Sequence, residues 1–215
     1  MSLNDELKQL EQEILNSFEP DIKKQMVLEN AKLFSSFVNK KPLKAGDKAP
    51  NILIRDNNLK NVFLDDLLRE HNIVLSFFRG TWCPYCTHEL LALAKINKFI
   101  ENKGAKLIAI SPELNDNHPP NILNSISFPL YTDLANKAAN EFGLVFDLTP
   151  EFREIYHTLN IHLNKLNGEN SWTLPIPATF IISKQGNIVS TYVNADYMQR
   201  MEPKDILNQL DLLQK

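Results

Sequence analysis

Cys83 and Cys86 are the two cysteines of this 215-residue chain, and two residues separate them. The apolar run Ile73–Phe78 precedes them, and a helix-patterned segment, Glu89–Lys103, follows. Cysteines at positions i and i+3 of a first helical turn lie on one face, close enough to form a disulfide. A helix start also favours a thiolate, and the pKa of such C-x-x-C thiols falls to roughly 3.5–7.5. The pair therefore predicts a nucleophile and its resolving partner.

A structural cysteine pair and a zinc site are the alternatives. His88 is close to the cysteines in sequence, but no second C-x-x-C or H-x-x-x-H pattern follows, so we expect no metal. Because both cysteines belong to one motif, the chain has no framework of structural disulfides. This use of cysteine is typical of a redox-active dithiol in the reducing cytoplasm.

The composition excludes several functional classes. The chain is 43% hydrophobic with a net charge of -3, which is typical of a soluble globular protein. It contains no basic patch with interleaved aromatics, so we expect neither nucleic acid nor an anionic membrane as a partner. The segment Met1–Glu6 lacks the pattern of a signal peptide, and no apolar run is long enough to span a membrane.

Side chains beside the cysteines are candidates for supporting roles. Trp82 is expected to form a wall that shields the disulfide, and Tyr85 to be exposed and to contact a substrate. Arg79 is a charge at the end of a buried strand; it either steadies a thiolate or pairs with a nearby acid, and the sequence leaves both open. The remaining histidines are expected to be surface or packing residues: His71, His118, His157 and His162.

Periodicity predicts an α/β chain with an N-terminal helical extension, residues 1–40, and a main domain, residues 41–215. Helices are expected over 3–18 and from Pro20, the second burying Ile22, Met26, Val27, Leu33, Phe34 and Phe37. These helices either cover the core or pair with another subunit in a homodimer. Further helices are expected over 65–70, 87–103, 117–124, 133–142, 150–159 and 203–213, and 160–172 is expected to be irregular. Expected strands are 51–55, 61–64, 73–78, 105–110, 129–132, 178–182 and 188–193, which predicts a central mixed β-sheet flanked by helices.

The motif W-C-x-x-C between a strand and a helix resembles the thioredoxin fold. The segment Ile176–Ile181 is similar to the one in which thioredoxin-like proteins carry a cis-proline opposite the cysteines. The resemblance implies a cis bond before Pro177 and a backbone at Ile176 that binds the extended chain of a substrate. The buried acid of thioredoxins has no counterpart, because Phe77 occupies its position.

A closer resemblance is to the peroxiredoxin-like branch of the AhpC/TSA superfamily. It rests on several segments in order: Gly46–Pro50, Arg79–Cys86, Leu107–Pro112, Asn140–Leu144, Leu174–Thr179 and Ala195–Arg200. Thr81 and Thr179 within them are expected to support the site, and Asp196, Tyr197 and Arg200 to form a network near it. Peroxiredoxins would place the peroxidatic cysteine at Cys86, but their threonine and proline positions hold Cys83 and Arg79, and no arginine lies near Pro177.

The sequence therefore predicts a thiol–disulfide oxidoreductase of peroxiredoxin-like type with an antioxidant role. Cys83, at an exposed lip, attacks a disulfide and the more covered Cys86 resolves the product. Substrate contacts are expected from Trp82, Pro84, Tyr85, Ile176 and Pro177. The protein needs no cofactor, and its reductant is of thioredoxin or glutathione type.

Two alternatives stay open. The first is a thiol peroxidase in which peroxide oxidises Cys86 to a sulfenic acid and Cys83 condenses with it. The second is an interaction protein whose N-terminal helices bind a partner and whose redox site is secondary. The substrate is accordingly a protein disulfide, a small-molecule disulfide or a peroxide.

Overall fold

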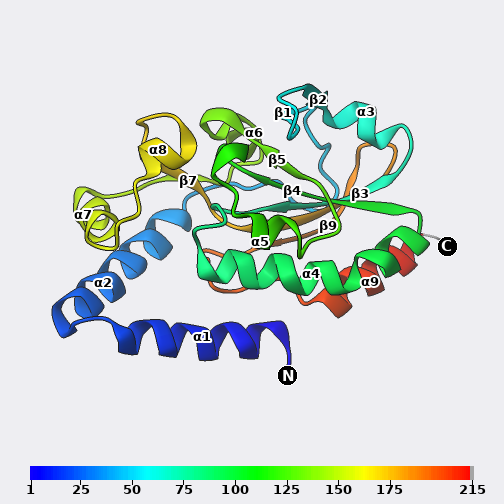
Figure 1. The fold of residues 1–215 in the computed structure, drawn as a ribbon. Helices are drawn as coiled ribbons and strands as arrows, with labels where there is room; N and C mark the ends of the chain where they lie inside the picture. Colours follow the sequence, from blue (N-terminus) through cyan, green and yellow to red (C-terminus); the bar gives the residue numbers. More distant parts are fainter. Residues whose placement is uncertain (214–215) are drawn as a thin grey trace.

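Strand β3 (Asn72–Phe77) lies at the centre of the fold and leads directly to the cysteine segment (Figure 1). The computed structural model describes residues 1–213. Within these residues, a mixed sheet of seven strands runs in the order β2-β1-β5-β4-β3-β8-β9. β3 pairs parallel with β4 and antiparallel with β8, which confirms the predicted central mixed sheet. The other strands are β1 (Leu53–Arg55), β2 (Asn61–Phe63), β4 (Ala105–Ser111), β5 (Leu130–Thr132), β8 (Ala178–Ile182) and β9 (Ile188–Val193).

The side chains around β3 alternate between two hydrophobic cores, one on each face of the sheet. Ile73, Leu75 and Phe77 belong to one core, whereas Val74 and Phe78 belong to the other. All five are at most 1% exposed. A strand that is covered on both faces needs apolar side chains at every position, which accounts for the continuous apolar run in the sequence.

Helices cover both faces of the sheet. α4 (Pro84–Asn102) and α9 (Pro203–Leu212) pack against each other on one face (Figure 1). α3 (Leu64–Leu68) and α6 (Lys137–Glu141) contribute to the core of the opposite face. In the described part of the chain, no helix combines the length and the apolarity that crossing a membrane requires.

The cysteine motif forms the start of α4. Cys83 is the residue that caps the helix, and Cys86 lies in the first turn. Pro84 occupies the first helical position, where its missing N–H group costs no hydrogen bond and its fixed φ suits a helix. The first turn contains no acidic residue, so no carboxylate in it opposes the positive end of the helix dipole next to Cys83.

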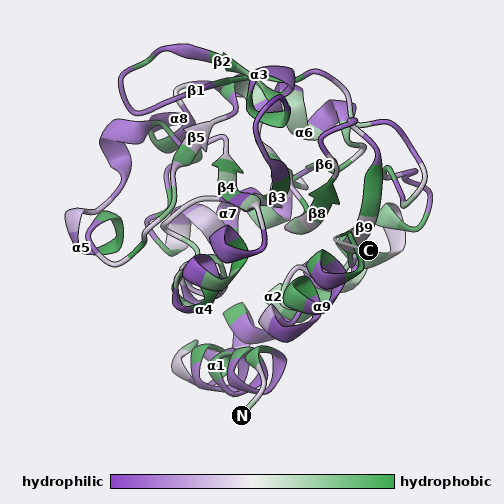
Figure 2. Ribbon diagram, turned by 90° about the vertical axis from the view of Figure 1, so that its right-hand side faces the viewer, coloured by the Kyte–Doolittle hydropathy of each residue, from purple (hydrophilic) through white to green (hydrophobic). Residues whose placement is uncertain are grey.

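The two N-terminal helices fold over the face of the sheet that carries α4. α1 (Leu3–Ser17) packs against α4, and α2 (Pro20–Phe37) packs against α7 (Pro150–Thr158). Figure 2 shows α1 below α4 and next to α2. Leu3 and Leu7 of α1 are buried in the core that includes both cysteines. The helices therefore cover the core of their own chain, the first of their two expected roles.

The start of α1 is bound to the segment that follows β9. The carboxylate of Glu202 accepts hydrogen bonds from the backbone N–H groups of Leu3 and Asn4, both at 2.9 Å. The Asn4 side chain donates to the Arg200 carbonyl and accepts from the Arg200 N–H, both at 2.8 Å. We call Asn4, Arg200 and Glu202 the α1 latch. It satisfies N–H groups that a helix start otherwise leaves unpaired.

Some segments differ from the sequence prediction. Residues 160–172, expected to be irregular, contain helix α8 (Leu163–Asn167). β6 (Val145–Asp147) and β7 (Thr173–Pro175), which the sequence analysis missed, pair with each other outside the main sheet. Val27, expected to be buried, is 52% exposed because it lies on the outer face of α2.

Two expected helices are shorter than predicted. In 133–142, Ala135 and Asn136 have positive φ angles of 56° and 55°, so the α-helix begins only after them. The Asp133 carboxylate then accepts hydrogen bonds from two backbone N–H groups at the start of α6. The helix expected over 117–124 is reduced to a short 3₁₀ turn and α5 (Pro120–Leu123).

We expect Glu202→Ala to weaken the docking of α1. The change leaves N–H groups of the first turn without an acceptor, which costs about 1–2 kcal/mol for a lost cap. Urea unfolding measures this loss, and alkylation of Cys83 should become faster because α1 opens more often. Glu13→Ala removes an exposed carboxylate from the same helix and should change the stability by less than about 0.5 kcal/mol. Equal stabilities of the two variants would contradict the role of the latch.

Candidate active site

Cys83 and Cys86 are both free thiols and both buried, with an exposed fraction of 0%. The expectation that Cys83 lies at an exposed lip is therefore wrong. Arg79 packs against its sulfur, and the N-terminal helices close over the same region of the molecule. Tyr85, expected to be exposed, is only 6% exposed for the same reason, and its ring packs edge-on against Tyr197.

The guanidinium of Arg79 contacts the sulfur of Cys83. Its Nη2 donates to Sγ at 3.0 Å, and its Nη1 donates to the hydroxyl of Tyr156 at 3.2 Å. The same guanidinium lies 3.8 Å from the centroid of the Tyr197 ring, a cation–π distance. Of the two roles left open for Arg79, the structure therefore shows contact with the sulfur and, among residues 1–213, no ion pair with a carboxylate.

The two thiols have opposite pKa shifts. Burial raises the pKa of Cys83, but a hydrogen bond from Cys86 and the charges of Arg79 and Arg200 outweigh burial and lower this pKa to about 5. Burial raises the pKa of Cys86, and the hydrogen bond to Cys83 and the charge on that sulfur raise it further. At neutral pH the pair is thus a Cys83 thiolate that accepts a hydrogen bond from the Cys86 thiol. The direction for Cys83 is the one that the motif predicts.

A second buried arginine lies beside Cys86. Arg200, 2% exposed, donates from Nε to Glu89 at 2.5 Å, and its Nη2 lies 3.6 Å from the sulfur of Cys86. Burial raises the pKa of Glu89 to about 7, even though the charge of Arg200 opposes the shift. Tyr197 and Arg200 are thus brought to the site, as the resemblance implies. Asp196 instead accepts a hydrogen bond from the backbone of Met198.

A buried carboxylate holds the loop before Cys83. Glu113 accepts hydrogen bonds from the backbone N–H of Thr81 at 2.6 Å and from its hydroxyl at 2.8 Å, which gives Thr81 its supporting place. His118 is also buried, with Nε2 at 3.5 Å from Glu113. Burial lowers the pKa of His118 to about 4, so the ring is neutral at physiological pH. Among the residues described, no group of three or more His, Cys, Asp or Glu could hold a metal ion.

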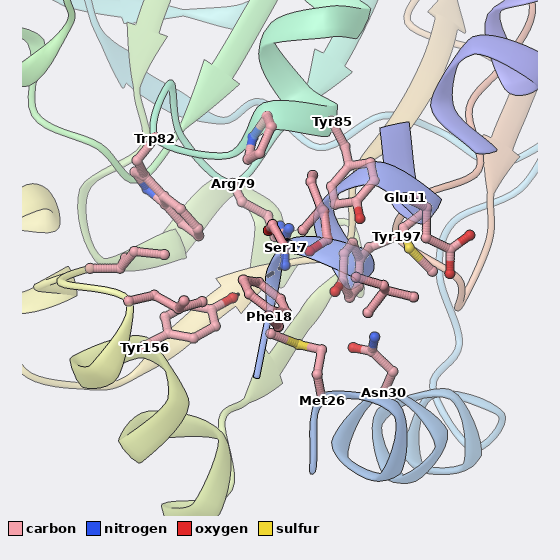
Figure 3. A pocket seen from close by; sticks show the side chains of 16 residues that line it. Glu11, Ser17, Phe18, Met26, Asn30, Arg79, Trp82, Tyr85, Tyr156 and Tyr197 are labelled. Carbon is pink, nitrogen blue, oxygen red and sulfur yellow. Dashed lines mark hydrogen bonds between the residues drawn. The ribbon is translucent and has the colours of Figure 1, made fainter. Parts of the chain in front are cut away.

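A cavity of about 370 Å³ is lined by Arg79, which also donates to the sulfur of Cys83 (Figure 3). Trp82 and Pro84 of the cysteine segment line it. The remaining walls come from Tyr85 of α4 and from α1, α2, the region of α7 and the segment after β9: Glu11, Ile14, Leu15, Ser17, Phe18, Met26, Asn30, Tyr156, Leu159, Ile161, Tyr197 and Met198. Most of these side chains are aromatic or aliphatic, so the cavity suits a small apolar molecule.

The segment around Pro177 differs from the implied substrate groove. No peptide bond in residues 1–213 is cis, so the expectation of a cis-proline at Pro177 is wrong. The chain crosses here in extended form from β7 to β8, and the N–H of Ile176 already donates to the carbonyl of Leu144 at 2.9 Å. Ile176 and Thr179 are buried, Thr179 opposite Ser76 of β3. Neither Ile176 nor Pro177 lines the cavity.

Three buried residues of this site were not predicted from the sequence: Glu89, Glu113 and Tyr156. Glu89 follows Cys86 by three residues and therefore shares its helix face, a spacing that could have indicated the contact. Glu113 directly follows the segment Leu107–Pro112, but only the structure brings it to Thr81. No local signal connects Tyr156 to Arg79, which lies 77 positions away.

A dithiol at the start of a helix, next to the central strand of a mixed sheet, defines a redox protein of the α/β class. Residues 45–191 match the model of the AhpC/TSA family, and the protein belongs to this family. The thiol-disulfide oxidoreductase ResA of Bacillus thuringiensis (strain Al Hakam) is 23% identical over 168 residues, which cover 77% of this chain and 79% of that protein.

Two further proteins illustrate the peroxiredoxin side of the family. 1-Cys peroxiredoxin A of Oryza sativa subsp. japonica is 26% identical over 111 residues, 48% of this chain and 50% of that protein. The crystal structure of peroxidoxin BcpB from Mycobacterium tuberculosis superposes with a TM-score of 0.61 at 18% identity, covering 80% of this chain and 99% of the other. This likeness shows the fold, and it confirms the predicted thioredoxin-like class.

We expect Arg79→Gln to raise the pKa of Cys83 from about 5 toward the ordinary value of about 8.5, because the cation that stabilises the thiolate is lost. Since the thiolate is the reactive form, the pH profile of alkylation by iodoacetamide reports this pKa. Arg153→Gln is the matched control, because Arg153 lies against Trp172 rather than a sulfur, and its profile should stay that of the wild type. An unshifted profile for Arg79→Gln would contradict the electrostatic role of Arg79.

We expect the neutral, buried His118 to make folding sensitive to acid. Its pKa in the folded protein, about 4, is below the value of about 6.5 expected when unfolded, so the unfolded state binds more protons as the pH falls between them. Between about pH 7 and about pH 4.5, the wild type should lose about 2 kcal/mol relative to His118→Phe in urea unfolding. The same change at His71, whose side chain is 44% exposed, is the control for replacing a histidine with phenylalanine. Parallel pH profiles for wild type and His118→Phe would contradict this account.

Proposed function

We propose that the protein is a thiol–disulfide oxidoreductase in which Cys83 is the nucleophile and Cys86 the resolving cysteine. The observation that carries the proposal is the hydrogen bond from Arg79 to the sulfur of Cys83, which favours the thiolate at that cysteine. The names of the ResA relatives and the peroxiredoxin relatives, together with the family, support thiol redox chemistry. The protein is accordingly an oxidoreductase.

The reaction needs two exchanges. The Cys83 thiolate attacks one sulfur of a substrate disulfide, so that a mixed disulfide forms and the other substrate sulfur leaves as a thiolate. Cys86 then loses its proton and attacks the Cys83 sulfur, which releases the second substrate thiolate and leaves a disulfide between Cys83 and Cys86. Two electrons have passed from the protein to the substrate. A dithiol or glutathione returns them by the same exchange in reverse.

The proton of Cys86 has an acceptor in its surroundings. Glu89 and the sulfur of Cys86 interact with the same guanidinium, that of Arg200. A carboxyl with a pKa of about 7 takes up and releases protons readily at neutral pH. When Cys83 becomes part of the mixed disulfide its charge disappears, so the pKa of Cys86 falls as soon as this cysteine must attack. Cys86 thus becomes a better nucleophile once Cys83 has formed the mixed disulfide with the substrate.

The peroxidase alternative assigns the cysteines opposite roles. It requires Cys86 to be the thiolate that attacks a peroxide, yet burial and the neighbouring Cys83 raise the pKa of Cys86. Arg200, the cation near Cys86, is already paired with Glu89. The pattern of charges therefore supports attack by Cys83, and the peroxidase with Cys86 as the peroxidatic residue is the weaker of the two.

The N-terminal helices bear on the interaction-protein alternative. α1 and α2 supply walls of the cavity next to Arg79, so their removal should alter the thiol chemistry as well as any association. This placement supports a role for them in the redox function itself. The division of the chain into residues 1–40 and 41–215, a homodimer, the antioxidant role and the reducing cytoplasm as the location stay predictions. Reductants of thioredoxin or glutathione type likewise remain predictions.

Trapping experiments separate the two enzyme functions. With a disulfide substrate, Cys86→Ser should accumulate a mixed disulfide on Cys83, because the resolving thiol is missing, and mass spectrometry should detect it. Cys83→Ser should trap none. After hydrogen peroxide, a stable sulfenic acid on Cys86 in Cys83→Ser, formed faster than on a free thiol, would contradict this assignment and support the peroxidase.

A further inference from the structure

Arg79 depends on a sulfur for its counter-charge. The side chain is 4% exposed, and within residues 1–213 it forms hydrogen bonds with the sulfur of Cys83 and the hydroxyl of Tyr156 but no ion pair with a carboxylate. Its Nε is buried and has no hydrogen-bond partner among these residues. A buried cation requires a compensating anion. The Cys83 thiolate is the anion in contact with Arg79.

Oxidation removes this anion. When Cys83 and Cys86 form a disulfide, the thiolate and the thiol give up two electrons to a substrate disulfide and one proton to solvent, and both sulfurs become neutral. Arg79 then keeps the neutral hydroxyl of Tyr156 and the rings of Tyr197 and Trp82 as neighbours, but it has no anion in contact among the described residues, whereas Arg200 donates to Glu89. The two arginines near the cysteines thus differ: Arg200 has a carboxyl group as a hydrogen-bond partner, whereas the anion in contact with Arg79 is the thiolate that oxidation removes.

The cavity described above gives a small anion access to Arg79. Arg79 lines this space of about 370 Å³, and Figure 3 shows Arg79 and Tyr156 facing each other at the cavity. Apolar side chains such as Phe18 and Met26 form much of the remaining wall. The volume lies at the small end of the range for ligand pockets, roughly 300–1,000 Å³. A ligand that fits must therefore be small, largely apolar and singly anionic.

Two other polar side chains of the cavity bear on the charge of the ligand. Asn30 is 8% exposed and lines the cavity, and its Oδ1 has no hydrogen-bond partner among the described residues. This oxygen is an acceptor and does not bind a carboxylate, so the attraction for an anion comes from Arg79. Glu11 also lines the cavity; burial, and then the charge of Asp196, raise its pKa. Glu11 forms no ion pair with Arg79. The cavity thus presents one unpaired cation when the cysteines are oxidised.

We propose that this cavity is a redox-dependent binding site for a small apolar monocarboxylate, which binds the oxidised protein through Arg79 and places its apolar part among the aromatic side chains. The proposal rests on the proposed function in one respect, the formation of the disulfide between Cys83 and Cys86. Reciprocity then requires the carboxylate to stabilise the oxidised state. With saturating ligand, a tenfold preference for that state lowers the reduction potential of the pair by about 30 mV.

Phenylacetate is a suitable probe, with phenylacetamide as its neutral counterpart of similar shape. Isothermal titration calorimetry should show phenylacetate binding at least tenfold more tightly to the oxidised wild type than to the reduced protein. Phenylacetamide should show no such preference. Equal affinity of phenylacetate for both redox states would overturn the proposal, as would an equal preference shown by the amide.

Variants test the site without relying on redox chemistry. Under reducing conditions, Cys83→Ser replaces the thiolate with a neutral hydroxyl, so it should bind phenylacetate as tightly as the oxidised wild type does. Cys86→Ser is the matched control: it keeps the Cys83 thiolate and should bind as weakly as the reduced wild type. If Cys83→Ser binds no better than Cys86→Ser, the anion site is refuted, whatever the cysteines do with disulfides.

The remaining outcomes are equally decisive. A protein that forms no disulfide, but whose Cys83→Ser variant binds phenylacetate, would refute the proposed oxidoreductase and support the anion site. Arg79→Gln should lose binding in both redox states, with circular dichroism as the check on its fold. If a redox preference appears only in Glu11→Gln, then Glu11 itself neutralises Arg79 in the oxidised protein, and the proposal is wrong.

Discussion

The chemistry of this molecule depends on one electrostatic contact, that between the guanidinium of Arg79 and the sulfur of Cys83. Two unit charges about 4 Å apart attract by about 1 kcal/mol in bulk water and by about 4 kcal/mol at the effective dielectric constant of a protein. Burial alone would favour the thiol. Because both partners are buried together, the same low dielectric that penalises each isolated charge strengthens the attraction between them. The thiolate is stable only within this arrangement.

The contact also makes the two cysteines different. In the sequence, Cys83 and Cys86 are two equivalent thiols at the start of a helix. In the structure, each has its own arginine, but Arg200 is occupied by Glu89 whereas Arg79 is not paired with a carboxylate of the described residues. A thiol beside a neutralised cation keeps its proton, and a thiol beside a free cation loses it. The direct hydrogen bond from Arg79 and the hydrogen bond between the two sulfurs therefore make Cys83 the more acidic cysteine.

Local patterns in the sequence were sufficient for much of the fold. The apolar run before the cysteines, the terminal hairpin and the long helix that begins at the motif all follow from neighbouring residues, and the structure confirms them. The predictions failed for contacts between residues that are far apart in the sequence. The separate pairing of β6 with β7 joins residues almost thirty positions apart, and no hydrophobic periodicity in the local sequence predicts this pairing.

The site shows the same limit more sharply. The motif predicted the acidity of Cys83, because the helix start lies within it, but the exposure of Cys83 and Tyr85 was misjudged. Their burial depends on α1 and α2. The amphipathic pattern of these helices predicts that one face of each is buried, but it does not predict which part of the chain covers that face. Glu89 and Arg200 are 111 positions apart, and nothing in the sequence around either residue indicates that they are in contact. Charge pairs of this kind become visible only after the chain has folded.

The α1 latch has a kinetic consequence. The main chain of Arg200 binds α1, and its side chain lies near the sulfur of Cys86. One residue therefore holds α1, which we call the lid, and also contributes charge next to a cysteine. Any reagent too large for the cavity must wait for the lid to separate. Such openings are partial unfolding events, whose rates rise steeply with temperature. The reaction rate with bulky partners is then governed by how often the fold opens rather than by the reactivity of the sulfur. Warming should increase that rate far more than the reaction rate with small molecules.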